Sequence, residues 1–210
     1  MDSKQLNLLK ELRGLSGISM SLCKKVLEEC DWDIIKAQEL LKEECLKFAS
    51  KKLNADTPDG AVIIASIDNI IYGTIIRCQT DFVAKSKDFS IMSQKVLNTH
   101  INQGNIQDVL TEYITKFSSN LKVDNIIEFT GNSYTYLHNK FSPITCEKGA
   151  IVELLHPNPD LGKDLGMQIV AMKPQSLDEL LNQPFIKQSS VDIKNLIGDN
   201  KIIKFQLLSI

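Results

Sequence analysis

The stretch R-C-Q-T-D-F-V-A-K, Arg77 to Lys85, follows a β-branched run that ends at Ile76 and precedes a run with helical spacing. A chain that passes from strand to helix needs polar side chains to accept the first free N–H groups, and Thr80 and Asp81 can both do so. Phe82 has no such local explanation. Its side chain either turns into the core, which the local pattern favours, or projects as an anchor for a partner, since aromatic residues are enriched at interface hot spots.

The segments around this stretch alternate between strand and helix patterns. Two β-rich runs, Ala61 to Ile67 and Ile70 to Ile76, flank Asp68-Asn69 and predict a β-hairpin. The later pattern predicts helices over 88–100, 106–117, 161–172, 176–181 and 192–197, strands over 123–129, 134–138, 149–155 and 201–208, and a polar loop over 139–148. Together these segments predict an α+β fold with an antiparallel sheet.

The first fifty residues have a purely helical pattern. Runs over 3–17, 20–30 and 34–51 carry leucines at helical spacing. Gly14 and Gly17 are both candidate ends of the first run, Ser19 can begin the second, and either Asp31 or Asp33 begins the third. Residues 54–60, N-A-D-T-P-D-G, have the composition of a linker. We therefore expect a three-helix domain over 1–52, followed by an α+β core with one subdomain over 53–130 and a second, shortened one over 131–210.

Composition excludes several classes of protein. The chain has 210 residues, of which 43% are hydrophobic and 24% charged, and its net charge near −2 argues against a mainly electrostatic nucleic-acid binder. No apolar run approaches the ~20 residues of a membrane span, and no signal-peptide pattern occurs. The Arg-poor start does not resemble a mitochondrial transit peptide. These features predict a cytoplasmic protein with no nucleic-acid or membrane partner, and favour a bacterial cytoplasm over an organelle matrix.

Residues for catalysis are scarce. The five cysteines contain no C-x-x-C and match no zinc framework, so we expect reduced thiols and no metal site. No nucleotide-phosphate loop or dinucleotide motif occurs, and we expect no cofactor. Cys78 and His138 are the one conceivable nucleophile and base, although nothing in the sequence places them together. A binding or regulatory protein, not an enzyme, is favoured.

The order of several motifs resembles the bacterial-type elongation factor Ts family. The carriers are L-K-E-L-R at 9–13, C-K-K-V-L at 23–27, C-Q-T-D-F-V-A-K at 78–85, Y-L-H at 136–138, G-A-I-V-E-L at 149–154, M-Q-I-V-A-M-K-P at 167–174 and Q-P-F at 183–185. Residues 78–85, the signature segment below, are the most specific of these. The resemblance covers nearly the whole chain and implies an N-terminal domain similar to ubiquitin-associated (UBA) domains.

This resemblance implies guanine-nucleotide exchange on the GTPase elongation factor Tu, in its GDP-bound and nucleotide-free forms, during polypeptide elongation. Asp81 and Phe82 would enter a groove beside the magnesium site of the nucleotide and promote GDP release. The implied contact residues are Thr80, Asp81, Phe82, Val83, Met20, Lys24, His138 and Ile151. The resemblance thus reverses the local reading of Phe82, which becomes a protruding side chain above a packed base of Cys78 and Val83.

The sequence also departs from the family pattern. The glycine-rich first turn of the family is here S-G-I-S-M-S-L at 16–22, and only residues 175–182 lie where many members carry a coiled-coil hairpin. We therefore expect this hairpin to be absent. Two alternatives are an interaction protein that uses a UBA-like module without exchange activity, and a thiol enzyme built on Cys78.

Overall fold

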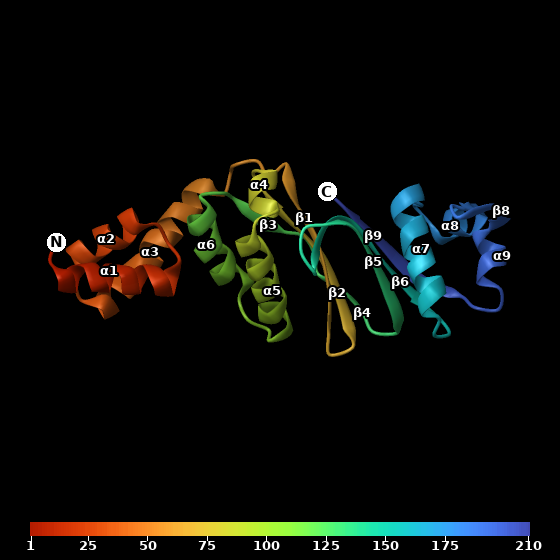
Figure 1. The fold of residues 1–210 in the computed structure, drawn as a ribbon, viewed down its shortest axis with the longest axis horizontal. Helices are drawn as coiled ribbons and strands as arrows, with labels where there is room; N and C mark the ends of the chain where they lie inside the picture. Colours follow the sequence, from red (N-terminus) through yellow and green to blue (C-terminus); the bar gives the residue numbers. More distant parts are fainter.

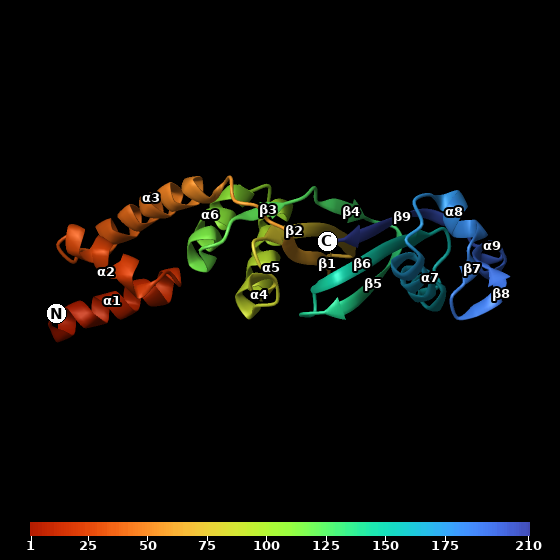
Figure 2. The same cartoon turned by 90° about the horizontal axis from the view of Figure 1, so that it is seen from above.

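The computed structural model describes residues 1–210 and is elongated, with three helices at one end of the long axis and α7 to α9 at the other (Figures 1 and 2). The helices are α1 (Ser3–Ser16), α2 (Met20–Glu29), α3 (Ile34–Lys52), α4 (Asp81–Ala84), α5 (Lys87–Ile101), α6 (Ile106–Phe117), α7 (Pro159–Met172), α8 (Leu177–Asn182) and α9 (Ile193–Ile197). The strands are β1 (Asp59–Ile67), β2 (Ile70–Cys78), β3 (Leu121–Val123), β4 (Ile127–Phe129), β5 (Asn132–Lys140), β6 (Thr145–Leu154), β7 (Pro184–Phe185), β8 (Gln188–Asp192) and β9 (Ile202–Ser209).

Helices α1 to α3, here called the three-helix module, begin and end where the local residues require. The Ser19 and Asp33 side chains accept backbone N–H groups at the starts of α2 and α3, and Gly17 ends α1 with a left-handed φ of 66°. Leucines, cysteines and Val26 from all three helices form one buried cluster. The module is therefore a small bundle with its own core, as the helical spacing predicts.

The sheet is antiparallel and has seven strands. Asp68 and Asn69 both have positive φ in the turn of the β1–β2 hairpin, which confirms the prediction made from their residue types. Strand β6 joins the two halves of the sheet, because it pairs with β1 at its start, with β5 along one edge and with β9 along the other. The fold is α+β, as expected.

The two halves of the sheet pack against each other, and helices cover their outer sides (Figure 1). A Cβ atom on Gly73 of β2 would lie 2.7 Å from Cδ1 of Ile151 in β6, so the strands approach closely at this point. Side chains alternate along the strands. Val62 and Ile151 face the layer between the halves, whereas Ile63 faces α5 and α6 and Val152 faces α7.

Two predicted segments differ from the structure, and a further small sheet was not predicted. The polar loop predicted over 139–148 is largely strand, because β5 continues to Lys140, β6 begins at Thr145, and only 141–144 form the turn. The single strand predicted over 123–129 is two short strands, β3 and β4, which pair with opposite ends of β2. The two-stranded sheet of β7 and β8 was not predicted.

No helix of the chain combines the length and the apolar character that a membrane crossing needs. The sheet extends through both halves of the core, and the proposed boundaries at 52/53 and 130/131 stay predictions.

Candidate functional site

The segment Thr80 to Val83, here called the tip, lies between β2 and α5 and includes the one-turn helix α4. Phe82 is 85% exposed, the largest exposed fraction among the large apolar side chains. The core position that local pattern favoured for Phe82 is therefore wrong, and the protruding position implied by the family resemblance is observed. The next residues point inward, since Val83 is half-buried against the core and Ala84 is buried.

The backbone around the tip is held by short polar contacts. The Cys78 thiol donates to the Thr80 carbonyl oxygen at 3.1 Å, and the Ser86 hydroxyl donates to the Val83 carbonyl oxygen at 2.8 Å. Ser86 also accepts from the N–H of Phe89, where it caps α5. Thr80 occupies the N-cap of α4, but its side chain accepts no capping bond. These contacts fix the tip on both sides and present Phe82 to solvent.

Asp81 forms an ion pair with Lys85, at 2.8 Å between Oδ2 and Nζ. The hydrogen bond from Lys85 is the main cause that lowers the pKa of Asp81 below its ordinary value. The Lys85 Nζ also lies 5.8 Å from the ring centroid of Phe141, in the turn between β5 and β6. The carboxylate next to Phe82 is therefore charged at neutral pH, and its cationic partner is on the protein itself.

The other expected contact residues lie apart from the tip. Met20 is 41% exposed and Lys24 is exposed one turn later on α2, at the far end of the molecule in Figure 1. His138 is exposed on β5. Ile151 is fully buried between the halves of the sheet, so the expectation that its side chain contacts a partner is wrong. Its alternation with Ala150 and Val152 places it in the core.

Cys78 cannot serve as the nucleophile of a thiol enzyme in this structure. The residue is fully buried, and this burial raises the pKa of its thiol to about 11. An unreactive, protonated thiol is expected under such conditions, because the thiolate is the nucleophile. The structure also contains no group of three or more His, Cys, Asp or Glu side chains arranged to hold a metal ion.

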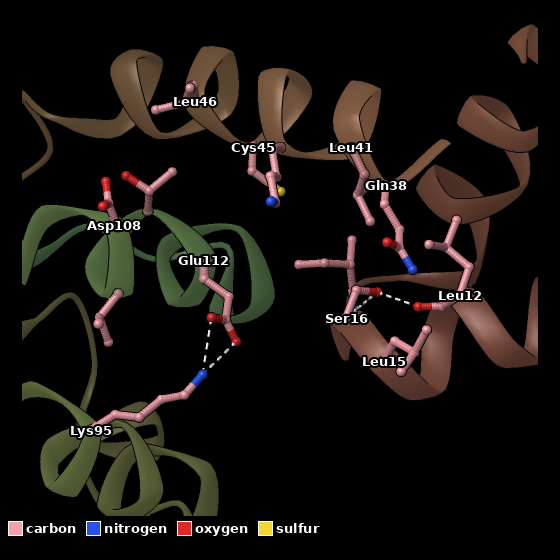
Figure 3. Close-up of a pocket in the computed structure, with 14 residues that line it drawn as sticks. Leu12, Leu15, Ser16, Gln38, Leu41, Cys45, Leu46, Lys95, Asp108 and Glu112 are labelled. Atoms are coloured by element: carbon pink, nitrogen blue, oxygen red, sulfur yellow. Dashed lines mark hydrogen bonds and ion pairs between the residues drawn. The ribbon is translucent and has the colours of Figure 1, made fainter. Parts of the chain in front are cut away.

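Two features were not found from the sequence. A groove of about 690 Å³ lies between the three-helix module and α5 and α6, with Leu12 and Leu41 on one side and Lys95, paired with Glu112, on the other (Figure 3). The second feature is a buried hydrogen-bond network around Asn120. Both assemble residues from distant parts of the chain, and no local spacing signals them.

Comparison with known proteins gives concordant matches. A family model described as elongation factor TS matches residues 79–179. The elongation factor Ts of Hydrogenobaculum sp. strain Y04AAS1 is 30% identical over 189 residues, covering 80% of this chain and 67% of that protein. That of Acidothermus cellulolyticus is 29% identical over 185 residues, with shares of 80% and 67%. That of Clostridium acetobutylicum is 29% identical over 231 residues, with shares of 96% and 70%. The chain thus spans about two thirds of the length of these relatives.

Proposed function

The chain belongs to the elongation factor Ts family, whose members serve translation elongation, and on that premise we propose that it is a guanine-nucleotide exchange factor for the GTPase elongation factor Tu. It binds the GDP-bound form, disturbs the magnesium and phosphate site and promotes GDP release. The observation that carries this proposal is Phe82, an 85% exposed aromatic side chain on a rigidly held turn within the signature segment.

Exchange follows from thermodynamic linkage. A factor that weakens nucleotide binding is itself weakened by the nucleotide to the same extent, so the two ligands share one coupling free energy. Each tenfold weakening requires about 1.4 kcal/mol. Burial of a phenylalanine side chain yields about 1.5–3 kcal/mol. If Phe82 is buried only in the state with a loosened nucleotide, it supplies about one to two powers of ten of this weakening.

The remaining contacts are proposed to lie along the length of the molecule. Thr80, Asp81 and Val83 accompany Phe82 at the tip. Met20 and Lys24 present one face of α2, since residues four apart lie on the same side of a helix. His138 provides a third contact on β5. An elongated protein with three separated contact regions can hold two domains of a GTPase at once, and the tip then acts on the nucleotide site between them.

The test is the release rate of fluorescent GDP from elongation factor Tu as the factor is titrated. The wild type is expected to accelerate release, and Phe82→Ala to reduce the maximal acceleration by about tenfold or more, in proportion to the lost burial. Ile203→Ala is the matched control, because Ile203 is also a large exposed apolar side chain but lies on β9, away from the proposed contacts.

Two outcomes would count against the proposal, in different ways. If the wild type binds elongation factor Tu without accelerating GDP release, the exchange activity is wrong and an interaction protein without exchange activity explains the chain better. If Phe82→Ala matches Ile203→Ala with full acceleration, the activity stands but Phe82 is not the group that carries it.

A further inference from the structure

Asn120, in the loop between α6 and β3, binds the chain just after α3. Its side chain is fully buried. The Nδ2 group donates to the carbonyl oxygen of Leu53 at 3.1 Å and to that of Ala55 at 2.7 Å. Leu53 is the C-terminal cap of α3, so both acceptors belong to the segment that leaves the three-helix module. One amide group therefore fixes the path of the chain at the exit from the module.

The same loop also binds the residue that precedes the tip. The backbone N–H of Asn120 donates to Oε1 of Gln79 at 3.0 Å, and the backbone N–H of Gln79 donates to the Ser119 hydroxyl at 3.1 Å. Gln79 is followed directly by Thr80. A continuous series of hydrogen bonds thus runs from the end of α3, through Asn120 and Gln79, to the start of the tip.

The end of α3 determines where the module lies relative to the core. Ala37, Leu41 and Cys45 of α3 belong to the cluster inside the module, whereas Ala49, in the last turn, belongs to the cluster beneath β1 and β2. One hydrogen bond joins α3 directly to α6, from the Thr115 hydroxyl to the Cys45 carbonyl oxygen at 3.4 Å, and Cys45 lines the groove in Figure 3. Beyond that bond, the bonds from Asn120 to Leu53 and Ala55 are the polar contacts that hold the end of α3 to the core.

An asparagine at position 120 is better explained by the two carbonyl groups that it holds in place than by a gain in the free energy of unfolding. Its Oδ1 atom is buried and has no hydrogen-bond partner, which is energetically unfavourable in a protein interior. An apolar residue would avoid this unfavourable term, but it could not donate to two carbonyl groups. Buried polar groups with several specific partners restrict a structure to one arrangement.

We propose that Asn120 is a positioning residue, which together with Gln79 holds the three-helix module and the tip at one fixed spacing so that both engage a single partner. The partner is elongation factor Tu, and this identity rests on the proposed function. Two contact regions that are held rigidly act with a higher effective concentration than two regions on a mobile connection. Loss of the network therefore weakens binding while leaving the action of the tip unchanged.

The orientation of the module can be measured without any partner, from backbone residual dipolar couplings in solution. In the wild type, one alignment tensor is expected to fit the amides of both the module and the core. Asn120→Ala and Gln79→Leu are expected to require two tensors, whereas Gln79→Glu, which keeps the acceptor for the Asn120 N–H, is expected to require one. Ser93→Ala is the matched control, because Ser93 is also fully buried but donates only within α5, to Phe89.

A second measurement uses the GDP-release titration. Asn120→Ala is expected to raise the half-saturating concentration about tenfold with little change in the maximal rate, as for partial loss of effective concentration.

If Asn120→Ala and Gln79→Leu both keep a single tensor, the positioning role is refuted. If the module reorients but the half-saturating concentration is unchanged, the role is refuted and exchange stands. If the wild type does not accelerate release, the proposed function fails while the couplings still decide the structural constraint. Should Asn120→Ala not fold, the two Gln79 variants decide the outcome.

Discussion

The close contact between α7 and β5 predicts that Gly162→Ala destabilises the protein. A Cβ atom at Gly162 would lie 2.2 Å from Cγ of Tyr134, whereas non-bonded carbon atoms are best separated by about 3.5–4.0 Å. The ring cannot easily turn away, because the Tyr134 hydroxyl accepts the backbone N–H of Asn158 at 2.9 Å, at the start of the same helix. Helix and strand must therefore separate by more than an ångström to accept one methyl group.

The magnitude follows from two opposing terms. Overpacking of a well-packed core costs about 1–3 kcal/mol. Replacement of a helical glycine by alanine stabilises the helix by roughly 0.8–1 kcal/mol, because alanine has the higher helix propensity. The two terms differ by about 0–2 kcal/mol. Because the helix and the strand must separate by more than an ångström, we expect the upper half of this range, so that Gly162→Ala lowers the free energy of unfolding by about 1–2 kcal/mol, mainly in α7 and the sheet beneath it.

Gly14 provides a control with the opposite sign. It lies within α1, and an added Cβ atom would meet nothing within 4 Å. Gly14→Ala should therefore stabilise the three-helix module by up to about 1 kcal/mol. Urea unfolding followed by circular dichroism, with hydrogen exchange of α7, measures the first variant. The fluorescence of Trp32, the single tryptophan, which packs on the module core, measures the second. If Gly162→Ala is as stable as the wild type, the close contact between α7 and Tyr134 is refuted.

Three further predictions concern the tip and the core. The pKa of Asp81 is depressed, so its contact with Lys85 stabilises the native state above the ordinary Asp pKa of about 3.9, and this stabilisation is lost as the pH falls through the depressed pKa. An NMR titration of Lys85→Met should show the Asp81 pKa closer to its ordinary value, and an unchanged pKa would contradict the pairing. At pH 7.5 iodoacetamide should modify the half-buried Cys30 before Cys78, because burial raises the Cys78 pKa to about 11, and peptide mass spectrometry measures the two rates. Rapid modification of Cys78 would argue against its burial. Ile151→Val should lower the free energy of unfolding by about 0.5–1.5 kcal/mol and leave GDP release unaffected at temperatures where the variant is folded. A selective loss of GDP release in the folded variant would indicate that Ile151 contacts the partner after all.

Local chemistry predicted much of the fold. Side chains at the starts of α2 and α3, the glycine that ends α1 and the Asp68-Asn69 turn each act over a few residues, and each behaves as its residue type indicates. The polar segment 139–148 shows the limit of this reasoning. Its residues look like a loop because most of them are hydrophilic, yet most of them are strand. Strand β5 pairs with β6 as far as Lys140 and Cys146, and Thr145 and Cys146 are buried where β6 pairs with β1.

The candidate site was also predicted from the sequence only in part. The signature segment predicted where the tip lies, but its local pattern favoured a buried Phe82, because periodicity cannot show which way a side chain turns in a helix of one turn. The prediction that Ile151 contacts a partner was wrong because its burial depends on a distant strand. Its strand is apolar on both faces, and the partner that buries it is β2, a strand about eighty residues earlier. Asn120 carries no local signal, since its acceptors at Leu53 and Ala55 become neighbours only after folding.

Helix α3 has a mechanical consequence because it spans both the module and the core. Its 19 residues give a length of about 28 Å. A tilt of about ten degrees at the end held by Ala49 and Asn120 moves the opposite end by about 5 Å, close to the rise of one helical turn. The position of the far end of the molecule therefore depends strongly on how the Asn120 loop and α6 orient this helix.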